Sequence, residues 1–582
     1  LSVSTGATLS VHAEIDENLK WAGYEESTNA YQYDGVQVNG GSLLVYGALN
    51  VAFTGLENDN SGDYSSQQIK SYAVRVEAAS GGETKVIIAS GNITNSVGGG
   101  IYVGGGEVTL GDSENNSGPN VKTEGKLLYA SVTNPDWSWQ QPTYEWKYVV
   151  NNSWKYMLNR SGGHAVEVSG GSLTVHGGSY SAQQGNGILI RNTSGSQIPN
   201  QVTINSGSFI GYNSGYYISY NNEYDETPLG GDRMVGPAAS YGLNVMGHDL
   251  TVTINGGSFG ETGETGNSAA SFFGTSGGVK ADVNVYGGTF NATNADAISI
   301  FRYIDIMFDG TAISSNIGGT ADVASLSVQD DLLYTNDPDR GSTITLENGT
   351  FTGTAYGVWY ACGYDQLNIS GNATINGKVG VQVASAPKTE KGIYISGGTI
   401  EGSTDGIYYN AGYGVSASIG GEGYGLNITG GTIRGTAKGN GHALNIAVQP
   451  RRHAISISGG ELYGGRDTVY VSNADGDEDA VSISGGTFTG AVADVEGSRD
   501  YGCAVWFNSG MNNSVYQFTG GTFITKNDGS AIYTSNPGGH DLSQIIPDGY
   551  SIRDQNGNSF GRNWKFDTTL NGKHWLTVER DN

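Results

Sequence analysis

Short runs that alternate apolar and polar residues recur along the chain, each followed by a Gly-Gly pair and then by a large apolar residue. Alternation over a few residues predicts a strand with one buried face. The Gly-Gly pair permits a sharp bend or a positive φ that a side chain would resist. We expect the apolar residue after the pair to turn inward again. Copies of this unit begin at Val166, Val252, Val283, Ile393, Leu426, Ile455 and Val481, with variants at Val202, Ile344 and Tyr516 and an early copy from Val36 to Leu43.

A second kind of strand follows many copies, as in the segments 406–409, 443–446 and 468–471. Successive Gly-Gly pairs from residue 397 onward are 33, 29, 26 and 35 residues apart. These intervals are too short for a propeller blade and contain no helical pattern. A repeated unit with at least two short strands and one variable loop predicts an all-β, right-handed parallel β-helix.

The β-helix is predicted to occupy residues 1–541, and residues 542–582 leave the pattern and are expected to form a C-terminal β cap. Long loops are expected at about 41–165, 210–250 and 291–343. In repeat proteins such insertions fall on one face and often form the binding surface. The regular coils from about residue 390 onward are therefore expected to be scaffold.

Composition narrows the function. The formal charge is −27, from 29 basic and 56 acidic residues, which argues against a nucleic-acid partner because no basic stripe displaces counterions. No apolar run of eighteen residues occurs, so a membrane-spanning segment is not expected. The composition suits an exported protein, extracellular or at the bacterial cell surface. Cys362 and Cys503 are expected to be buried, unreactive thiols.

Aromatic side chains gather in the first two predicted insertions. Four of the nine Trp residues fall within eighteen positions. Exposed aromatic faces stack on the apolar C–H faces of sugar rings, although a small core for a long loop is an alternative. The residues predicted to bind an oligosaccharide or glycoconjugate are Trp137, Trp139, Trp146, Trp154, Tyr217, Tyr220, Arg340 and Trp359.

Paired carboxylates could cleave a glycosidic bond, since hydrolysis needs one group to donate a proton and another to act as nucleophile or base. Asp330 and Asp337, seven positions apart in the third insertion, are the predicted catalytic pair. Asp225 and Asp232 have the same spacing and are the reserve pair. Solvated loops or Ca²⁺ ligands would explain either pair without catalysis.

Two acidic segments are candidates for calcium. Asp475, Asp477 and Asp479 offer oxygen ligands at alternate positions, as does the segment 57–63. Alternating side-chain oxygens in a tight loop suit a hard cation. Acidic turns without a metal are an equal alternative. The eight His residues have no zinc-ligand spacing, and no organic cofactor is expected.

The coils at 393–400, 426–433 and 481–488 resemble exported β-helix proteins of gut bacteria, a set that includes surface adhesins and glycoside hydrolases. Among the enzymes, the chain looks most like the β-helix lacto-N-biosidases, which release lacto-N-biose from human milk oligosaccharides. The resemblance implies a retaining mechanism with Asp330 as nucleophile and Asp337 as acid/base, Ca²⁺ in some members, and a folding-helper domain or subunit as a partner.

Two other functions remain open. A non-catalytic adhesin would bind a glycan through the same aromatic loops without turnover. A polysaccharide lyase would need a basic residue as base, and the sequence offers one tight basic cluster at 451–453.

Overall fold

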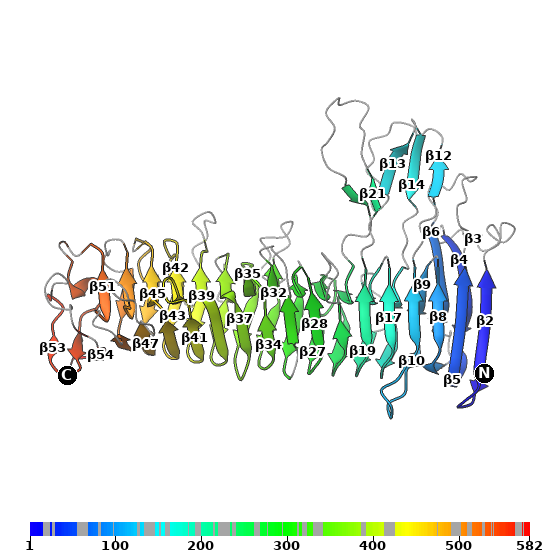
Figure 1. Ribbon diagram of the computed structural model, residues 1–582, viewed down its shortest axis with the longest axis horizontal. Helices are drawn as coiled ribbons and strands as arrows, with labels where there is room; N and C mark the ends of the chain where they lie inside the picture. The colour runs from blue at the N-terminus through cyan, green and yellow to red at the C-terminus, as the bar shows by residue number, and fades with distance from the viewer. Residues whose placement is uncertain are drawn as a thin grey trace. The chain divides into compact units, whose positions relative to one another are not determined.

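The computed structural model divides the chain into two compact units, unit 1 from Leu1 to Asp282 and unit 2 from Val283 to Asn582. Each unit contains stacks of short strands (Figure 1), and β27 (Ala281–Val285) spans the division. The structure describes the whole chain apart from residues 15–23, 26–29, 55–67, 79–82, 97, 125–128, 133–145, 151–152, 158–162, 184, 193–199, 213–215, 219–232, 236–239, 261–267, 276, 294, 311–312, 317–322, 330–340, 386–390, 412–424, 474, 491–501, 509–514, 526–529, 537, 539, 565–572, 574 and 582. It describes the backbone alone at 12–14, 24–25, 30–33, 53–54, 68–71, 129–132, 146–150, 153–157, 216–218, 233–235 and 313–316.

One coil contains three strands, and each pairs in parallel with its counterpart in the next coil. In unit 2, for example, β43 (Ile455–Ile457) pairs with β46 (Val481–Ile483), β44 (Glu461–Gly464) with β47 (Thr487–Gly490), and β45 (Asp467–Val471) with β48 (Val505–Phe507). Parallel pairing of the same strand in successive coils defines a parallel β-helix, so the predicted fold class is confirmed. The coil has three strands, where the sequence predicted at least two.

The strands of unit 1 form three stacks. The first contains β1 (Ser2–Val3), the first half of β5 (Gly41–Thr54), β7 (Thr84–Ser90), β10 (Glu107–Leu110), β16 (Ser172–Val175), β19 (Asn200–Ile204) and β24 (Leu250–Ile254). The second contains β2 (Thr8–Glu14), the second half of β5, β8 (Asn92–Asn95), β11 (Asn120–Thr123), β17 (Ser179–Ala182), β20 (Ser208–Gly211) and β25 (Ser258–Phe259). The third contains β4 (Ala30–Asn39), β6 (Gln68–Glu77), β9 (Gly99–Val103), β15 (Val166–Val168), β18 (Ile188–Asn192), β23 (Leu243–Gly247) and β26 (Ala270–Gly274).

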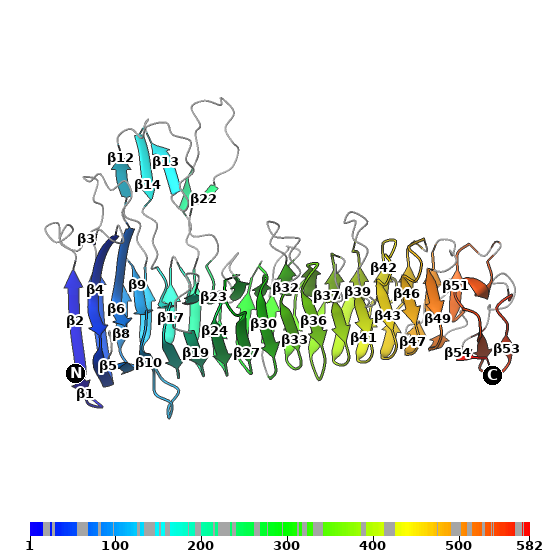
Figure 2. The same cartoon turned by 180° about the vertical axis from the view of Figure 1, so that it is seen from behind.

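The strands of unit 2 also form three stacks, and Figure 2 shows strands of the first stack at the front of the view. This stack contains β30 (Ile304–Phe308), β33 (Thr343–Leu346), β36 (Gln366–Ile369), β38 (Ile393–Ile395), β40 (Leu426–Ile428), β43 (Ile455–Ile457), β46 (Val481–Ile483) and β49 (Tyr516–Phe518). The second contains β28 (Thr289–Ala292), β31 (Ile313–Asn316), β34 (Thr350–Thr352), the first halves of β37 (Thr374–Val383) and β39 (Thr399–Tyr409), β41 (Thr432–Gly435), β44 (Glu461–Gly464), β47 (Thr487–Gly490) and β50 (Thr522–Thr525). The third contains β29 (Ile298–Ile300), β32 (Ala324–Gln329), β35 (Tyr356–Ala361), the second halves of β37 and β39, β42 (His442–Ile446), β45 (Asp467–Val471), β48 (Val505–Phe507) and β51 (Ile532–Thr534).

The Gly-Gly pair forms the corner between the first and second strands. Its second glycine has a positive φ, for example 82° at Gly431 and 94° at Gly486. The apolar residue that follows is buried, and in the second stack Phe488 packs on Phe523 with ring centroids 4.9 Å apart. The predicted bend and inward turn are both confirmed.

Two of the aligned copies place the Gly-Gly pair at a different corner of the coil. In the copies that begin at Val36 and Val166, the Gly-Gly pair joins a third strand to the first strand of the next coil, β4 to β5 and β15 to β16. Both corners accept glycine in unit 1, so sequence alone does not distinguish them.

The predicted insertions contain more coil than expected. Within 41–165, strands β5 to β11 belong to regular coils, and within 291–343 so do β29 to β32. Two small antiparallel sheets lie outside the three stacks. One contains β12 (Tyr129–Val132), β13 (Trp146–Val150) and β14 (Ser153–Met157), and the other β21 (Tyr216–Ile218) and β22 (Arg233–Val235). In the sequence, each of these small sheets follows a strand of the second stack and precedes a strand of the third stack.

The chain ends of the two units differ from the coils. In unit 1, β3 (Tyr24–Glu25) pairs antiparallel with β4. In unit 2 a short 3₁₀ helix, η2 (Leu542–Gln544), precedes β52 (Tyr550–Asp554), β53 (Ser559–Phe560) and β54 (Trp575–Arg580), and β54 pairs antiparallel with β50. Over the described residues, no helix is long and apolar enough to cross a membrane.

Substitution of Gly431 by Ala should lower the free energy of unfolding by about 1–3 kcal/mol. A Cβ at Gly431 would lie 2.6 Å from the carbonyl oxygen of Gly397, on a backbone with φ of 82°. Gly439→Ala is the control, because a Cβ there has no atom within 4 Å. Chemical unfolding of both variants checks this, and equal stabilities would contradict the assigned role of the corner.

Candidate functional site

Most of the residues predicted to bind or cleave a glycan lie outside the described residues. Asp330, Asp337, Arg340, Trp137, Trp139 and Tyr220 are in this group, as are Asp225, Asp232 and the acidic segment 57–63. Trp146, Trp154 and Tyr217 lie on β13, β14 and β21, where the backbone is described and the side chains are not. Their roles stay predictions.

The predicted calcium ligands lie in the connection between β45 and β46. Asp477 Oδ2 accepts a hydrogen bond from the backbone N–H of Arg452 and lies 3.7 Å from Arg451 Nη1. The carboxylate of Asp479 accepts from the side chain of Gln517. In the described part of the chain, no three His, Cys, Asp or Glu residues are grouped closely enough to hold a metal ion. The geometry therefore does not support the predicted calcium site. The contacts of Asp477 also partly neutralise the basic cluster at 451–453, which was the candidate base for a lyase.

Trp359 is the predicted sugar-binding residue whose side chain the structure describes, and it belongs to a larger row. The third stack of unit 2 carries one outward residue per coil, each the register partner of the next. We call this set the outward row, and from β35 onward it consists of Trp359, Gln382, Tyr408, Asn445, Tyr470, Trp506 and Tyr533. Its neighbours on each strand, such as Val469 and Val471, are buried, whereas the rings of Trp359, Tyr408, Tyr470 and Tyr533 are partly exposed.

The third stack lies between the two variable turns of each coil. From β38 onward, the corner between first and second strands always contains three residues, as in 429–431 and 458–460. The connections before and after the third strand vary, for example 465–466 against 491–504 before it. Variable connections beside a rigid strand carry function more often than constant corners. The outward row is therefore the face on which a ligand is expected.

Three ionisable side chains form a second column at the start of the same strands, which we call the start column. Asp405, His442 and Asp467 occupy the same register in successive coils. Their exposed fractions are 8%, 5% and 0%. Strands in a sheet are ~4.8 Å apart, so the backbones of Asp405 and Asp467 are separated by about 9–10 Å.

The start column contacts the outward row of the following coil. Asn445 Nδ2 donates to Asp405 Oδ1 at 3.2 Å, and the His442 ring stacks on Tyr470 with centroids 4.8 Å apart. Arg466, next to Asp467, places its guanidinium 4.3 Å from the centroid of the Trp506 ring. The two sets therefore form one surface.

Polar atoms around Asp467 are incompletely bonded. Oδ1 accepts the backbone N–H groups of Cys503 and Gly502 at 3.0 and 3.3 Å. Oδ2 lies 3.8 Å from His442 Nδ1 and 3.2 Å from Arg466 Nε, but neither approach has hydrogen-bond geometry. Among the described residues, Asp467 Oδ2, His442 Nδ1 and Asn445 Oδ1 are buried without a hydrogen-bond partner. Unbonded buried polar atoms are costly, so a water molecule or ligand group is expected beside them.

Burial shifts the protonation of the start column. It raises the pKa of Asp405 to about 6 and that of Asp467 to about 7, because the ionised carboxylates lose hydration. Burial, together with the nearby Arg466 guanidinium, lowers the pKa of His442 to about 4. Shifted carboxyl groups beside an aromatic surface are typical of functional sites, although structural networks also cause such shifts.

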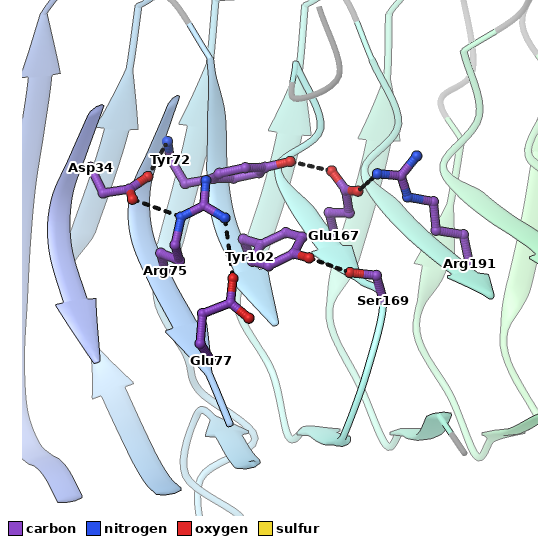
Figure 3. A network of polar contacts seen from close by, with 8 residues as sticks. All are labelled: Asp34, Tyr72, Arg75, Glu77, Tyr102, Glu167, Ser169 and Arg191. Atoms are coloured by element: carbon purple, nitrogen blue, oxygen red, sulfur yellow. Dashed lines mark hydrogen bonds and ion pairs between the residues drawn. The ribbon is translucent and has the colours of Figure 1, made fainter. Parts of the chain in front are cut away.

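Unit 1 uses the same two positions for a closed network (Figure 3). Asp34 and Tyr72 are register partners on β4 and β6, and Arg75, Tyr102 and Glu167 are successive outward residues. Arg75 Nε lies 2.6 Å from Asp34 Oδ2, and the Tyr72 hydroxyl donates to the Glu167 carboxylate. The Arg75 guanidinium lies 4.8 and 4.7 Å from the centroids of the Tyr72 and Tyr102 rings.

The remaining contacts complete this network. Arg191 Nη2 lies 2.6 Å from Glu167 Oε1, Arg75 Nη1 lies 3.3 Å from Glu77 Oε1, and Ser169 Oγ donates to the Tyr102 hydroxyl at 2.6 Å. Burial and the Glu167 carboxylate raise the pKa of Tyr72, so its hydroxyl stays protonated. Tyr72 and Glu167 are 2% and 0% exposed, and their hydrogen bond connects third strands that are two coils apart.

The sequence contains a signal for the start column. Asp405, His442 and Asp467 each immediately precede one of the second-strand segments that begin at 406, 443 and 468. Alignment of those segments would have placed the three residues in one column. No protein family, curated protein or solved structure matches the chain, so the assignment depends on geometry alone.

Asp467→Asn should change how stability depends on pH. Because the folded pKa of about 7 is above the ordinary value of 3.8, the native chain loses stability as the pH rises between those values. The variant lacks this loss, so its free energy of unfolding should improve relative to the native chain over that range, by at most about 4 kcal/mol. An Asn oxygen can still accept the two backbone N–H groups.

Chemical unfolding at a series of pH values measures the effect. Glu461→Gln, an exposed substitution on the same coil, is the control. A constant difference between the Asp467→Asn variant and the native chain across this pH range would contradict a raised pKa at Asp467.

Proposed function

We propose that this chain is an extracellular carbohydrate-active protein that binds an oligosaccharide on the outward row of unit 2 and hydrolyses a glycosidic bond beside Asp405. One observation carries the proposal. A column of Asp405, His442 and Asp467 contacts two partly exposed side chains of the outward row, Asn445 and Tyr470. Rings stack on sugar faces, amides bond to sugar hydroxyls, and carboxyl groups supply acid catalysis.

Asp405 has the properties of a proton donor. Its carboxyl group is held by Asn445, and its pKa of about 6 keeps part of the population protonated near neutral pH. In the proposed reaction, Asp405 gives its proton to the glycosidic oxygen as the bond to the sugar carbon breaks. General acid catalysis of this kind contributes about 10²- to 10⁴-fold to the rate.

His442 and Asp467 would activate the attacking water. The imidazole takes one proton from water while the oxygen bonds to the sugar carbon, and the Asp467 carboxylate stabilises the resulting imidazolium. Because water attacks the sugar carbon directly, with no covalent intermediate on the protein, the configuration at that carbon is inverted. This differs from the retaining mechanism implied by the resemblance to lacto-N-biosidases.

The finer proposal concerns the substrate. The resemblance in the repeat sequence suggests release of lacto-N-biose from host or milk oligosaccharides, with Asp330 and Asp337 as the competing catalytic pair. Those two residues follow β32, whose Ser327 is the register partner of Trp359. Asp330 and Asp337 therefore follow a strand of the third stack in sequence, and Asp405 and Asp467 lie on strands of that stack. Mutation is needed to decide which of the two pairs is catalytic.

A non-catalytic glycan-binding adhesin is the second candidate. Asp467 Oδ1 accepts the backbone N–H of Cys503 one coil on, as Asp34 does for Tyr72 and Asp296 for Ala324. A backbone-capping role therefore explains Asp467 without catalysis. The outward row would then bind a glycan without turnover.

Asp405→Asn should lower kcat by about 10²- to 10⁴-fold, because it removes the proton donor, while leaving oligosaccharide affinity within a few-fold. Release of disaccharide from a chromogenic lacto-N-bioside and from lacto-N-tetraose measures this. The native rate should be bell-shaped in pH with its maximum between about 6 and 7, since Asp405 must be protonated and Asp467 ionised.

Matched variants decide between the candidates. Glu461→Gln, an exposed change on the second stack, should leave the rate unchanged. Loss of activity in Asp330→Asn or Asp337→Asn with full activity in Asp405→Asn would move catalysis to the competing pair. Glycan binding without product from the native chain would establish the adhesin.

A further inference from the structure

The aromatic residues of the outward row alternate with amides over five consecutive coils. Trp359, Tyr408 and Tyr470 occupy every second coil, and Gln382 and Asn445 occupy the coils between them. Successive coils are ~4.8 Å apart, so the rings repeat every ~9–10 Å along the stack. The row therefore has a period of two coils.

This period matches the repeat of an extended β-linked glycan. In such a chain each sugar is turned by about half a turn from its neighbour, so the same ring face recurs with every disaccharide, at about the spacing of these rings. The sugars between would present their edges, with hydroxyl groups, to Gln382 and Asn445. A helical α-linked glycan curves away from a straight row and cannot maintain this alignment.

Two further observations indicate the chemistry of the ligand. Trp359 Nε1, a donor, and Asn445 Oδ1, an acceptor, are buried without a hydrogen-bond partner among the described residues. Sugar hydroxyls both donate and accept, so one ligand can supply both partners. The five side chains of the alternating row are uncharged, and the chain carries a net charge of −27, which disfavours a polyuronate.

We infer that the outward row binds a neutral, linear β-linked glycan that lies along the stack, with one disaccharide for every two coils. This inference rests on the proposed glycan-binding function of the row and adds the ligand class and its direction. From Trp359 to Tyr470 the alternating part of the row spans four coil intervals, about 19 Å, which is the length of roughly four sugars.

The dependence of binding affinity on the length of the oligosaccharide tests the inference. The complete chain is titrated calorimetrically with cello-oligosaccharides and chito-oligosaccharides, from disaccharide to octasaccharide, and with malto-oligosaccharides of the same lengths. We expect affinity to rise mainly with each added disaccharide, to level off near the tetrasaccharide, and to be at least about tenfold weaker for the malto series.

Substitutions locate the binding. Tyr408→Ala should weaken the hexasaccharide about tenfold, since it removes a stacking ring, and Tyr408→Phe should restore affinity because the ring is kept. Tyr286→Ala is the control, because Tyr286 is an exposed ring outside the row. A Tyr408→Phe variant as weak as Tyr408→Ala would overturn stacking.

The outcomes separate this inference from the function on which it rests. Equal binding of the malto series, or no gain beyond the disaccharide, overturns the axial arrangement. In either case the proposed function survives if Tyr408→Ala still weakens glycan binding, or if the native chain still hydrolyses lacto-N-bioside. Failure to bind any glycan, with no hydrolysis, overturns both.

Discussion

The close approach of successive coils at the Gly-Gly corner is the constraint on which the other features depend. A Cβ on Gly459 would lie 2.2 Å from the carbonyl oxygen of Thr429, and one on Gly485 would lie 2.2 Å from that of Ser458. Glycine therefore lets each coil stack on the one before it, and the second glycine supplies the positive φ that turns the chain. From β38 onward this corner has three residues in every coil, and first and second strands keep a constant register from coil to coil.

From β38 onward, variation in length is confined to the other two turns, and both flank the third stack. Loops of any length can be added there without disturbing the corner, which places variable segments around one rigid sheet. On that sheet the outward row and the start column meet, because a residue at the start of one strand contacts an outward residue of the next coil. In unit 1 this meeting forms the buried network of Tyr72, Arg75 and Glu167. In unit 2 it leaves Asp467 and His442 with unbonded atoms beside partly exposed rings.

The sequence specifies the scaffold better than the site. Alternation before Gly-Gly predicts the strands, and the residue after it predicts the core, because both depend on neighbours in the chain. The start column depends on residues 37 and 25 positions apart, Asp405 to His442 and His442 to Asp467. Those separations differ because the variable turns differ, so no fixed spacing exists to find. Trp359 was predicted to contact a sugar and lies on the outward row, whereas Asp330 and Asp337 fall outside the described residues. The coils beyond residue 390, expected to be scaffold, carry the candidate site.

A crystal structure of the complete chain with a bound oligosaccharide tests the central claim most directly, namely that the third stack of unit 2 is the ligand face. The Asp405→Asn variant, soaked with a neutral β-linked hexasaccharide and separately with lacto-N-tetraose, would retain the ligand. The account predicts density along the row between Trp359 and Tyr533, with a glycosidic oxygen within hydrogen-bond distance of residue 405. Density against the segments that contain Trp137 to Trp154 or Asp330 to Arg340, with none on the row, would contradict it.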